Sequence, residues 1–218
     1  MCSSDLKTVP FAQVDDIDSL EAAIENIDLP AVLKTRRFGY DGKGQDWIRE
    51  AEDARGAWEA IGEQPAILEG AAPFTRELSV VAARSVSGEV LAFPLSENVH
   101  GDGILKTTTA PAPGVDRATQ ERALEIARAL GDELDHVGVF AVELFDLGDG
   151  DLIVNEIAPR VHNTGHWTMD GCSCDQFEQH MRAVSGWPLG DPSAHSACVM
   201  TNLIGHDADD WPALSADP

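Results

Sequence analysis

Two apolar runs separated by a short Gly/Asp segment constrain the fold of this chain more than any other feature. The runs are Val139–Phe145 and Leu152–Ile157, and Asp149-Gly150 lies between them. An Asp-Gly pair between two strand-like runs is the strongest short-range signal of a β-hairpin. If these two residues form the turn, the strands pair symmetrically about it and Glu143 falls opposite Glu156.

Two directly opposed glutamates in the middle of a hairpin need a neutralising partner. Their Cβ atoms would lie about 4.5–5.5 Å apart, and two carboxylates at about 5 Å repel by roughly 3 kcal/mol at an effective dielectric near 20. Either a proton or a cation relieves this repulsion. Asn155 adds a neutral oxygen beside Glu156, and hard oxygen ligands suit Mg²⁺ held jointly with phosphates.

A simpler interpretation of the hairpin remains open. Both glutamates could face solvent on the polar side of an edge hairpin, and a register slip of one residue would separate them. The segment that follows favours a functional site, because it places Arg160, His162, Asn163 and His166 directly after the second glutamate. A cation, an arginine and several neutral donors together form a site for an anion such as phosphate or bicarbonate.

The net charge narrows the classes of partner. The chain has 38 acidic and 15 basic residues, a net charge of −23, and its lysines are only Lys7, Lys34, Lys43 and Lys106. A nucleic-acid-binding surface needs a basic footprint, which this composition does not supply. The excess of acid favours adaptation to high salt, where screening reduces self-repulsion; an ordinary acidic cytosolic protein is the alternative.

The cysteines and the hydropathy pattern indicate a cytoplasmic protein without a membrane span. Cys2, Cys172, Cys174 and Cys198 are too few and too scattered for a disulfide framework, and no second ligand pair supports zinc. No apolar run has the length of a membrane span, and no signal peptide is recognisable. The first six residues are expected to be a non-native leader.

The remaining patterns predict an α+β protein with mixed or antiparallel sheets. Helices are expected where apolar residues recur at helical spacing after an acidic start, and strands where short β-branched runs end at turn residues. The expected helices are 19–27, 47–61, 116–134 and 175–184, and the expected extended segments are 7–14, 30–35, 65–69 and 76–94.

A glycine-rich loop at Phe38–Gln45 is a candidate phosphate contact. Gly39 and Gly44 have the spacing of a P-loop, but Gln45 stands where that motif requires lysine. Backbone amides of such a loop can still fold over phosphates. Lys34, at the end of a predicted buried strand, is a second candidate, although a surface lysine is the simpler interpretation.

Three stretches identify a family resemblance. They begin at Leu29 (Leu-Pro-Ala-Val-Leu-Lys-Thr-Arg-Arg-Phe-Gly-Tyr-Asp-Gly-Lys-Gly-Gln), at Glu97 (Glu-Asn-Val-His-Gly-Asp-Gly-Ile-Leu) and at Asn155 (Asn-Glu-Ile-Ala-Pro-Arg-Val-His-Asn-Thr-Gly-His-Trp-Thr). The chain resembles the 5-(carboxyamino)imidazole ribonucleotide synthases, ATP-grasp enzymes of de novo purine synthesis, from about Lys7 to Gly205.

The resemblance implies roles for particular residues. Glu143 and Glu156 would carry Mg²⁺, or Mn²⁺ in its place, and Arg160, His162 and Asn163 would hold bicarbonate. The adenine pocket would be lined by Glu69 and its neighbours, and Glu77 would bind the ribose hydroxyls. The full set of implied nucleotide contacts is Lys34, Gly39, Tyr40, Asp41, Gly42, Lys43, Gly44, Gln45, Glu69, Gly70, Ala71, Ala72, Glu77, His100, Asn155 and Glu156.

The resemblance also implies an architecture and a reaction. It implies an ATP-grasp fold with the nucleotide between two α+β subdomains, at 7–75 and 76–190, and the truncated start of a C-terminal domain at 191–218. An N-terminal Rossmann-like domain of the family has no counterpart here, so the isolated fragment is expected to be inactive, and a homodimer is expected at full length. ATP would phosphorylate bicarbonate, and the carboxyphosphate would carboxylate the amine of aminoimidazole ribonucleotide. The alternatives are another ATP-grasp carboxylate ligase or an inactive nucleotide-binding module.

Overall fold

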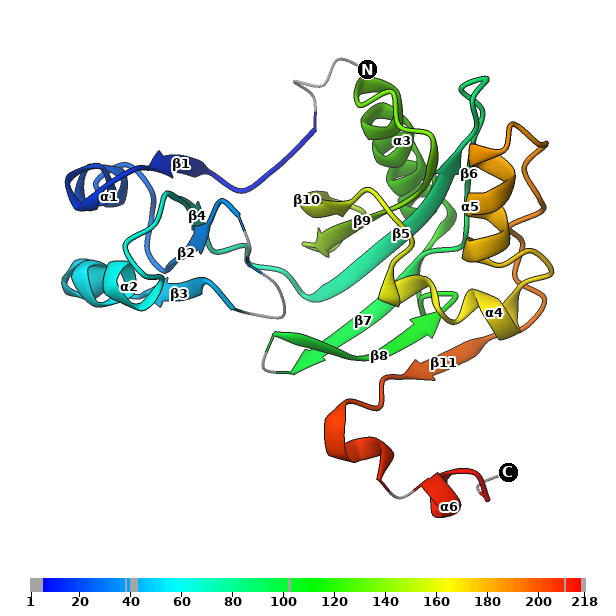
Figure 1. Cartoon of the computed structure of the whole chain (residues 1–218). Helices are drawn as coiled ribbons and strands as arrows, with labels where there is room; N and C mark the ends of the chain where they lie inside the picture. The colour runs from blue at the N-terminus through cyan, green and yellow to red at the C-terminus, as the bar shows by residue number, and fades with distance from the viewer. Residues whose placement is uncertain (1–5, 38, 40–42, 102, 210, 217–218) are drawn as a thin grey trace.

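The chain forms two lobes, each built on its own β-sheet (Figure 1). This computed structural model describes residues 6–37, 39, 43–101, 103–209 and 211–216. The smaller lobe contains the four-stranded sheet β1-β4-β2-β3, and the larger lobe contains a seven-stranded sheet. The α+β class expected from the sequence is therefore confirmed.

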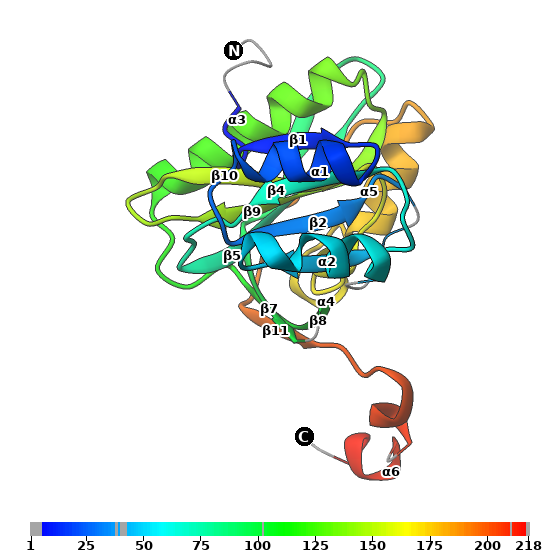
Figure 2. The same cartoon turned by 90° about the vertical axis from the view of Figure 1, so that its left-hand side faces the viewer.

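The helices that the structure describes in the smaller lobe lie on one face of its sheet. Figure 2 shows α1 and α2 in front of the strands, on the side away from the larger lobe. Asp16 caps α1, because its side chain accepts a hydrogen bond from the backbone N–H of Ser19 at 2.8 Å. The elements of this lobe are β1 (Phe11–Val14), α1 (Ile17–Ile24), β2 (Ala31–Thr35), β3 (Gln45–Ile48), the 3-10 helix η2 (Ala51–Asp53), α2 (Ala54–Ala60) and β4 (Ala66–Gly70).

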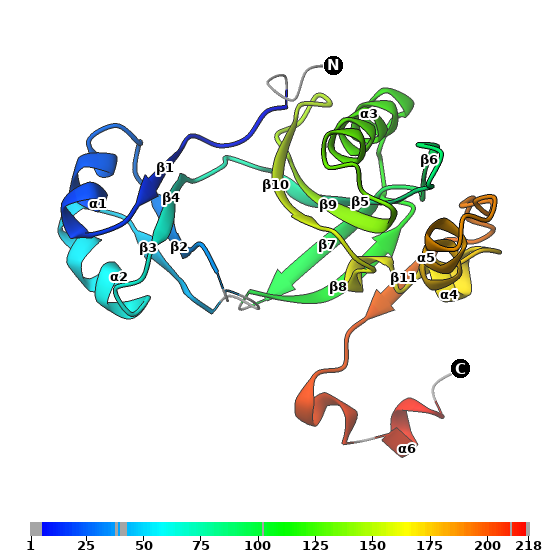
Figure 3. The same cartoon turned by 45° about the horizontal axis from the view of Figure 1, so that its top comes forward.

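The alternation of side chains along β2 and β4 places their charged residues on the face of the smaller sheet opposite α1 and α2. Leu33 of β2 and Leu68 of β4 are fully buried in the core beneath the two helices. Because successive strand residues point to opposite faces, Lys34 and Glu69 lie on the face without helices. Figures 1 and 3 show that this face is turned toward the larger lobe.

The larger sheet is covered on both faces. Its strand order is β10-β9-β5-β7-β8-β11, with β6 paired to β5. Helix α3 covers one face, and α5 with the 3-10 helix η3 covers the other. The elements are β5 (Arg76–Arg84), β6 (Val90–Ala92), β7 (Ser96–Gly101), β8 (Ile104–Ala110), α3 (Arg117–Glu133), β9 (Gly138–Asp146), β10 (Leu152–Ala158), η3 (Asn163–Gly165), α4 (Thr168–Gly171), α5 (Gln176–Val184) and β11 (Cys198–Thr201).

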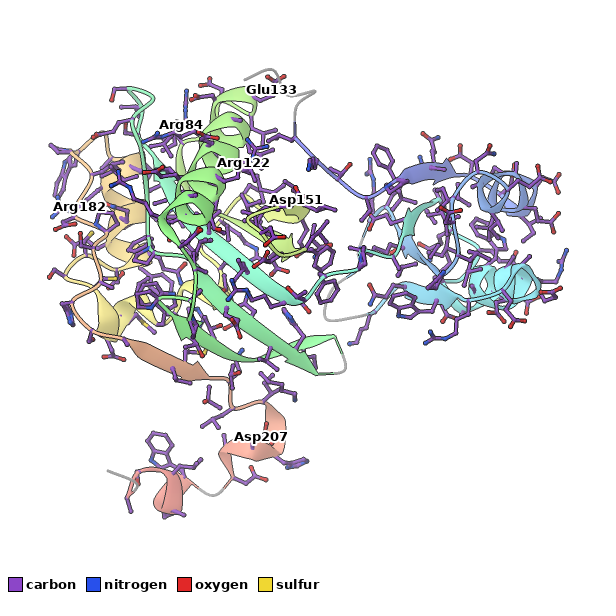
Figure 4. All side chains as sticks on the ribbon, turned by 180° about the vertical axis from the view of Figure 1, so that it is seen from behind. Arg84, Arg122, Glu133, Asp151, Arg182 and Asp207 are labelled. Carbon is purple, nitrogen blue, oxygen red and sulfur yellow. The ribbon has the colours of Figure 1, made fainter. Side chains whose placement is uncertain are left out.

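Side-chain contacts fix α3 at both of its ends. Asp116 accepts a hydrogen bond from the Thr119 N–H at 2.8 Å, and this bond lowers the pKa of the Asp116 carboxyl. At the other end, Arg84 of β5, which Figure 4 labels, reaches the Asp132 carboxylate at 2.9 Å. The amphipathic helix expected over 116–134 is therefore confirmed and is held against β5.

The tail after α5 returns to the larger sheet before it leaves the body of the molecule. Strand β11 pairs antiparallel with β8, so residues 198–201 extend that sheet. The 3-10 helix η4 (Gly205–Ala208) and α6 (Trp211–Leu214) then project outward in Figure 1. Within the described ranges, no helix is both long and apolar enough to cross a membrane.

Several local expectations from the sequence are wrong. The helix expected over 47–61 begins only at Ala54, because Gln45–Ile48 pairs with β2 as strand β3. The turn at Asp149-Gly150 is not a two-residue turn: Leu147 N–H donates to Asp151 O at 3.0 Å, which leaves a three-residue connection. Its members Gly148, Asp149 and Gly150 all have positive φ.

Candidate functional site

Glu143 of β9 and Glu156 of β10 are cross-strand partners, as the hairpin count predicted. The partnership depends on a β-bulge between Val154 and Glu156, which leaves Asn155 as an extra residue. Val154 packs against the core beneath α3. Without the bulge, Glu156 would lie on the α3 face as Val154 does, but the extra residue moves it to the face that carries Glu143.

Burial and the second carboxylate make ionisation of Glu143 unfavourable. The side chain of Glu143 is 15% exposed. Burial first, and then the charge of Glu156, raise the pKa of Glu143 to about 7. A carboxylate pair in which one member resists ionisation is a site where a divalent cation gains from binding, since its charge compensates the charges of both carboxylates.

Two further side chains from neighbouring strands join this pair. Glu77 of β5 lies on the same face as Glu143, and His100 of β7 meets it with an Nδ1–Oε2 distance of 2.7 Å. This contact with Glu77 raises the pKa of His100. Two groups of three side chains each bring one possible ligand atom per residue to within 4.8 Å of the others. The first group is Glu77, His100 and Glu143, and the second is Glu143, Glu156 and His162.

The segment after β10 brings His162 to the carboxylates. His162 Nε2 lies 3.7 Å from Glu143 Oε1. Burial, followed by the nearby charge of Arg160, lowers the pKa of His162 to about 4, so the ring is neutral at physiological pH. Arg160 is exposed, and Asn163 Oδ1 is buried without a partner among the residues that the structure describes. Such an oxygen can accept a hydrogen bond from a ligand.

His166, the fourth polar residue of this segment, makes a ring contact with α5. It stacks on Phe177 of α5 with ring centroids 5.9 Å apart, and burial lowers the pKa of His166. Arg160, His162 and Asn163 therefore remain the candidate anion ligands, and His166 packs against α5.

A buried polar network beneath the site was not anticipated from the sequence. The Asn98 amide donates to Ser79 Oγ at 2.6 Å, and Asn98 Oδ1 accepts from Thr164 Oγ1 at 2.8 Å and from Thr108 Oγ1 at 3.0 Å. Ser96 Oγ lies 3.1 Å from Thr164 Oγ1. The network ties the segment after β10 to β5, β7 and β8.

A second buried amide holds the same segment from α5. Gln176 Oε1 accepts from the His162 N–H at 2.9 Å, and Gln176 Nε2 donates to His162 O at 2.8 Å. Neither Asn98 nor Gln176 carries a local sequence signal of this role. Asn98 lies in the family stretch that begins at Glu97, and nothing else in the sequence points to its role. Gln176 is a polar residue at the start of a helix, a common place for such residues.

The smaller lobe contributes a second group of candidate residues. Lys34 Nζ lies 2.6 Å from Glu69 Oε2 on the helix-free face, so a predicted phosphate contact and a predicted adenine contact are paired with each other. Gly70 N–H donates to Pro10 O at 2.9 Å and Ala71 N–H to Pro30 O at 3.0 Å. Ala72 lies in the connection to the larger lobe, where Phe74 stacks on Phe145 of β9 with centroids 4.4 Å apart.

Part of the glycine-rich loop lies outside the described residues. Tyr40, Asp41 and Gly42 belong to that part, whereas Gly39, Lys43, Gly44 and Gln45 are described. Gly44 has φ +72°, and a Cβ there would lie 2.6 Å from Thr35 Oγ1, so only glycine fits. Gln45 begins β3 and pairs with Lys34.

The structure therefore gathers the predicted residues into two groups. Glu77, His100, Glu143, Glu156 and His162 converge on one face of the larger sheet, and Lys34 and Glu69 pair on the smaller sheet. These groups offer carboxylates for a cation and a lysine for phosphate, and the exposed Arg160 adds a guanidinium for a planar oxyanion.

Comparisons with known proteins identify the family of the chain. The family model for the ATP-grasp domain matches residues 1–177. N5-carboxyaminoimidazole ribonucleotide synthase of Brucella melitensis is 50% identical over 213 residues, which are 97% of this chain and 59% of that protein. The enzyme of the same name from Pseudomonas aeruginosa is 48% identical over 92% of this chain and 54% of its own length. The chain thus spans little more than half of these relatives.

Solved structures show the same likeness. The N5-carboxyaminoimidazole ribonucleotide synthetase of Thermus thermophilus is 46% identical, with a TM-score of 0.85 over 91% of this chain and 53% of that one. N5-carboxyaminoimidazole synthase of Aspergillus clavatus, in complex with ADP and 5-aminoimidazole ribonucleotide, is 29% identical, with a TM-score of 0.90 over 99% of this chain and 58% of that one.

Proposed function

The chain belongs to the ATP-grasp family, and on that premise we propose that it forms the nucleotide-, metal- and bicarbonate-binding part of an N5-carboxyaminoimidazole ribonucleotide synthase. The reaction would join bicarbonate to the exocyclic amine of 5-aminoimidazole ribonucleotide and convert ATP to ADP and phosphate. Relatives of this name cover nearly the whole chain, and one relative binds ADP and aminoimidazole ribonucleotide.

The observation that carries the proposal is the juxtaposition of a carboxylate pair and an anion-binding segment. Glu143 and Glu156 are opposed, and the segment Arg160–Asn163 returns His162 to within 3.7 Å of Glu143. A metal–phosphate centre and an oxyanion site are therefore neighbours. Phosphoryl transfer to bicarbonate requires this proximity, because both reactants must be held in line.

The residues present fit a divalent cation. Glu143 and Glu156 would hold it, and Asn155 beside them would add a neutral oxygen ligand. The observation that favours this assignment is the raised pKa of Glu143, which burial and then the charge of Glu156 cause. When bound, Mg²⁺, or Mn²⁺ in its place, neutralises phosphate charge.

The other side chains would bind and orient the substrates. Lys34 and the loop Gly39–Gln45 would contact the phosphates, Glu69 with Gly70, Ala71 and Ala72 would line the adenine pocket, and Glu77 with His100 would lie at the ribose. Arg160 would hold bicarbonate in bidentate fashion, with His162 and Asn163 completing its hydrogen bonds. Bicarbonate would accept the γ-phosphoryl group as ADP leaves. The C–N bond to the amine would then form as phosphate leaves and the amine loses a proton.

We further propose a cytoplasmic setting, a homodimer for the longer protein and adaptation to salt. The described cysteines Cys172, Cys174 and Cys198 are unpaired, which suits a reducing compartment. The net charge of −23 supports the saline habitat.

Turnover tests the proposal and separates it from its alternatives. The chain would be joined to the flanking domains of the Brucella melitensis relative, and ADP release would be measured with bicarbonate and aminoimidazole ribonucleotide, together and singly. Release that requires both substrates supports the proposal. Release with a different carboxylate would indicate another ATP-grasp ligase, and nucleotide binding without turnover would indicate a binding module.

A further inference from the structure

The anion-binding segment lacks a scaffold of its own. Between the end of β10 at Ala158 and the start of η3 at Asn163 the chain has no regular secondary structure. Its backbone groups must therefore find partners elsewhere, and those partners decide where its side chains lie. The backbone groups of His162 find such a partner in the buried side-chain amide of Gln176.

The Gln176 side chain forms hydrogen bonds with both backbone groups of His162. This side chain is fully buried, and it binds the N–H and the C=O of His162 at 2.9 and 2.8 Å. Because a primary amide offers both a donor and an acceptor in one plane, this pairing fixes the orientation of the His162 peptide as well as its position.

The packing around this amide leaves no room for adjustment. A Cβ added at Gly165 would lie 2.6 Å from Gln176 Oε1, so the glycine makes space for the amide. Thr168 Oγ1 accepts from the Gln176 N–H at 3.0 Å and donates to Gly165 O at 2.6 Å. From the sheet side, Thr164 is bound to Asn98 at 2.8 Å. Residues 162–165 are thus held between α5 and the sheet.

We propose that Gln176 is a positioning residue for the bicarbonate site: by binding the His162 backbone it places the side chain of His162 beside the Glu143–Glu156 pair. This inference rests on the proposed function for the identity of the anion. It assigns no contact between Gln176 and any substrate.

The same helix contains a matched control. Gln179, also fully buried, binds both backbone groups of Gly190 in the same way, with distances of 2.7 and 2.9 Å. The surroundings of Gly190 are Cys174 and Arg182, not the residues of the candidate site. Gln176→Ala and Gln179→Ala therefore remove equivalent hydrogen bonds, one pair beneath the site and the other elsewhere.

A structural readout tests positioning without any turnover. In the 218-residue chain, the ring signal of His162 would be followed by NMR at fixed pH and assigned with His162→Gln. We expect Gln176→Ala to shift or split this signal and Gln179→Ala to leave it in place, although both variants unfold at lower temperature. Equal His162 signals in the two variants would overturn the proposal.

Kinetics in the enzyme completed with flanking domains give the second readout. We expect Gln176→Ala to raise the KM for bicarbonate about 10-fold, since small displacements of positioning groups carry costs of this order, and to leave the KM for ATP nearly unchanged. A KM for bicarbonate equal to that of Gln179→Ala would also overturn it. If the wild-type enzyme shows no bicarbonate-dependent turnover, the proposed function fails, and the NMR comparison still decides the positioning role.

Gly165→Ala provides a second route should Gln176→Ala not fold. The added methyl displaces the amide instead of deleting it, so it should shift the His162 signal in the same way. In the Gln176→Ala background the same change should add little, because the atom it displaces is gone. A large additional effect there, or an unshifted His162 signal in Gly165→Ala alone, would contradict the proposed contact.

Discussion

Glu143 and Glu156 face each other across β9 and β10 because Asn155 is an extra residue in β10. Val154 and Ile157 both pack toward the α3 core, although an odd number of steps separates them in the sequence. Only a bulge reconciles these two placements, and it brings the second carboxylate to the face of the first. The backbone irregularity therefore creates the candidate metal site.

The raised pKa of Glu143 predicts a pH-dependent stability of the metal-free chain. Because the folded state keeps the Glu143 proton up to about pH 7, while the unfolded chain loses it near its ordinary value, the folded state binds more protons in between. The free energy of unfolding should therefore fall as pH rises through this window. Glu143→Gln should remove that loss and stabilise the metal-free chain above pH 7 by roughly 3 kcal/mol.

Denaturant unfolding with a chelator present, at several pH values, measures this effect. Glu133→Gln is the control, since Glu133 is exposed at the end of α3 (Figure 4). A Glu143→Gln variant less stable than the wild type above pH 7, or with the same pH slope, would show that the carboxylate pair is not strained.

The hairpin shows how far the sequence alone could lead. The expected pairing of Glu143 with Glu156 is correct, but it follows from two errors that cancel. The turn has three residues instead of two, so Leu152 pairs with Asp146 and not with Leu147, and the bulge at Asn155 restores the register. A β-bulge such as this one has no clear signal in the local sequence. Whether it forms depends on which side chains the two faces of the larger sheet can bury.

Strands with a polar interior were the main omission in the fold. Strands β7 and β8 carry Ser96, Asn98 and Thr108 into the protein interior, where their hydrogen bonds are made to each other and to Thr164. A search for alternating apolar and polar residues therefore could not find β7 and β8. Helix α3 was predicted closely, because its buried residues recur at helical spacing and Asp116 caps it.

Lys34 provides a prediction for the smaller lobe. Its ammonium is paired with Glu69 at 2.6 Å and lies on the face turned toward the larger lobe. If it contacts phosphate, Lys34→Met should weaken ADP binding about 10-fold, which corresponds to about 1.4 kcal/mol. Calorimetric titration of the chain measures this, with Lys7→Met as control, since Lys7 pairs with Asp151 at an exposed site. Equal affinities in the two variants would remove Lys34 from the nucleotide site.

Arg160 tests the bicarbonate assignment. Arg160→Lys keeps the charge but loses the planar fork that can grip an oxyanion in bidentate fashion. In the enzyme completed with flanking domains, bicarbonate-dependent ADP release should fall by about one to three orders of magnitude, with ATP affinity nearly unchanged. An unchanged dependence on bicarbonate would make Arg160 a surface residue and leave His162 and Asn163 as the anion ligands.

The acidic composition predicts a response to salt. With a net charge of −23, the folded chain repels itself, and salt shortens the screening length from about 10 Å at 0.1 M to about 3 Å at 1 M. The midpoint of thermal unfolding should therefore rise between low and molar KCl. A flat or falling midpoint would argue against adaptation to a saline habitat.

Metal-dependent nucleotide binding by the 218-residue chain tests the central claim most directly. ATP would be titrated calorimetrically with and without Mg²⁺ into the wild type, Glu143→Gln and Glu156→Gln. Since both carboxylates are assigned to one cation, Mg²⁺ should strengthen ATP binding to the wild type, and either substitution should abolish that gain. ATP binding to the wild type that Mg²⁺ leaves unchanged, or a gain that survives in both variants, would contradict the account.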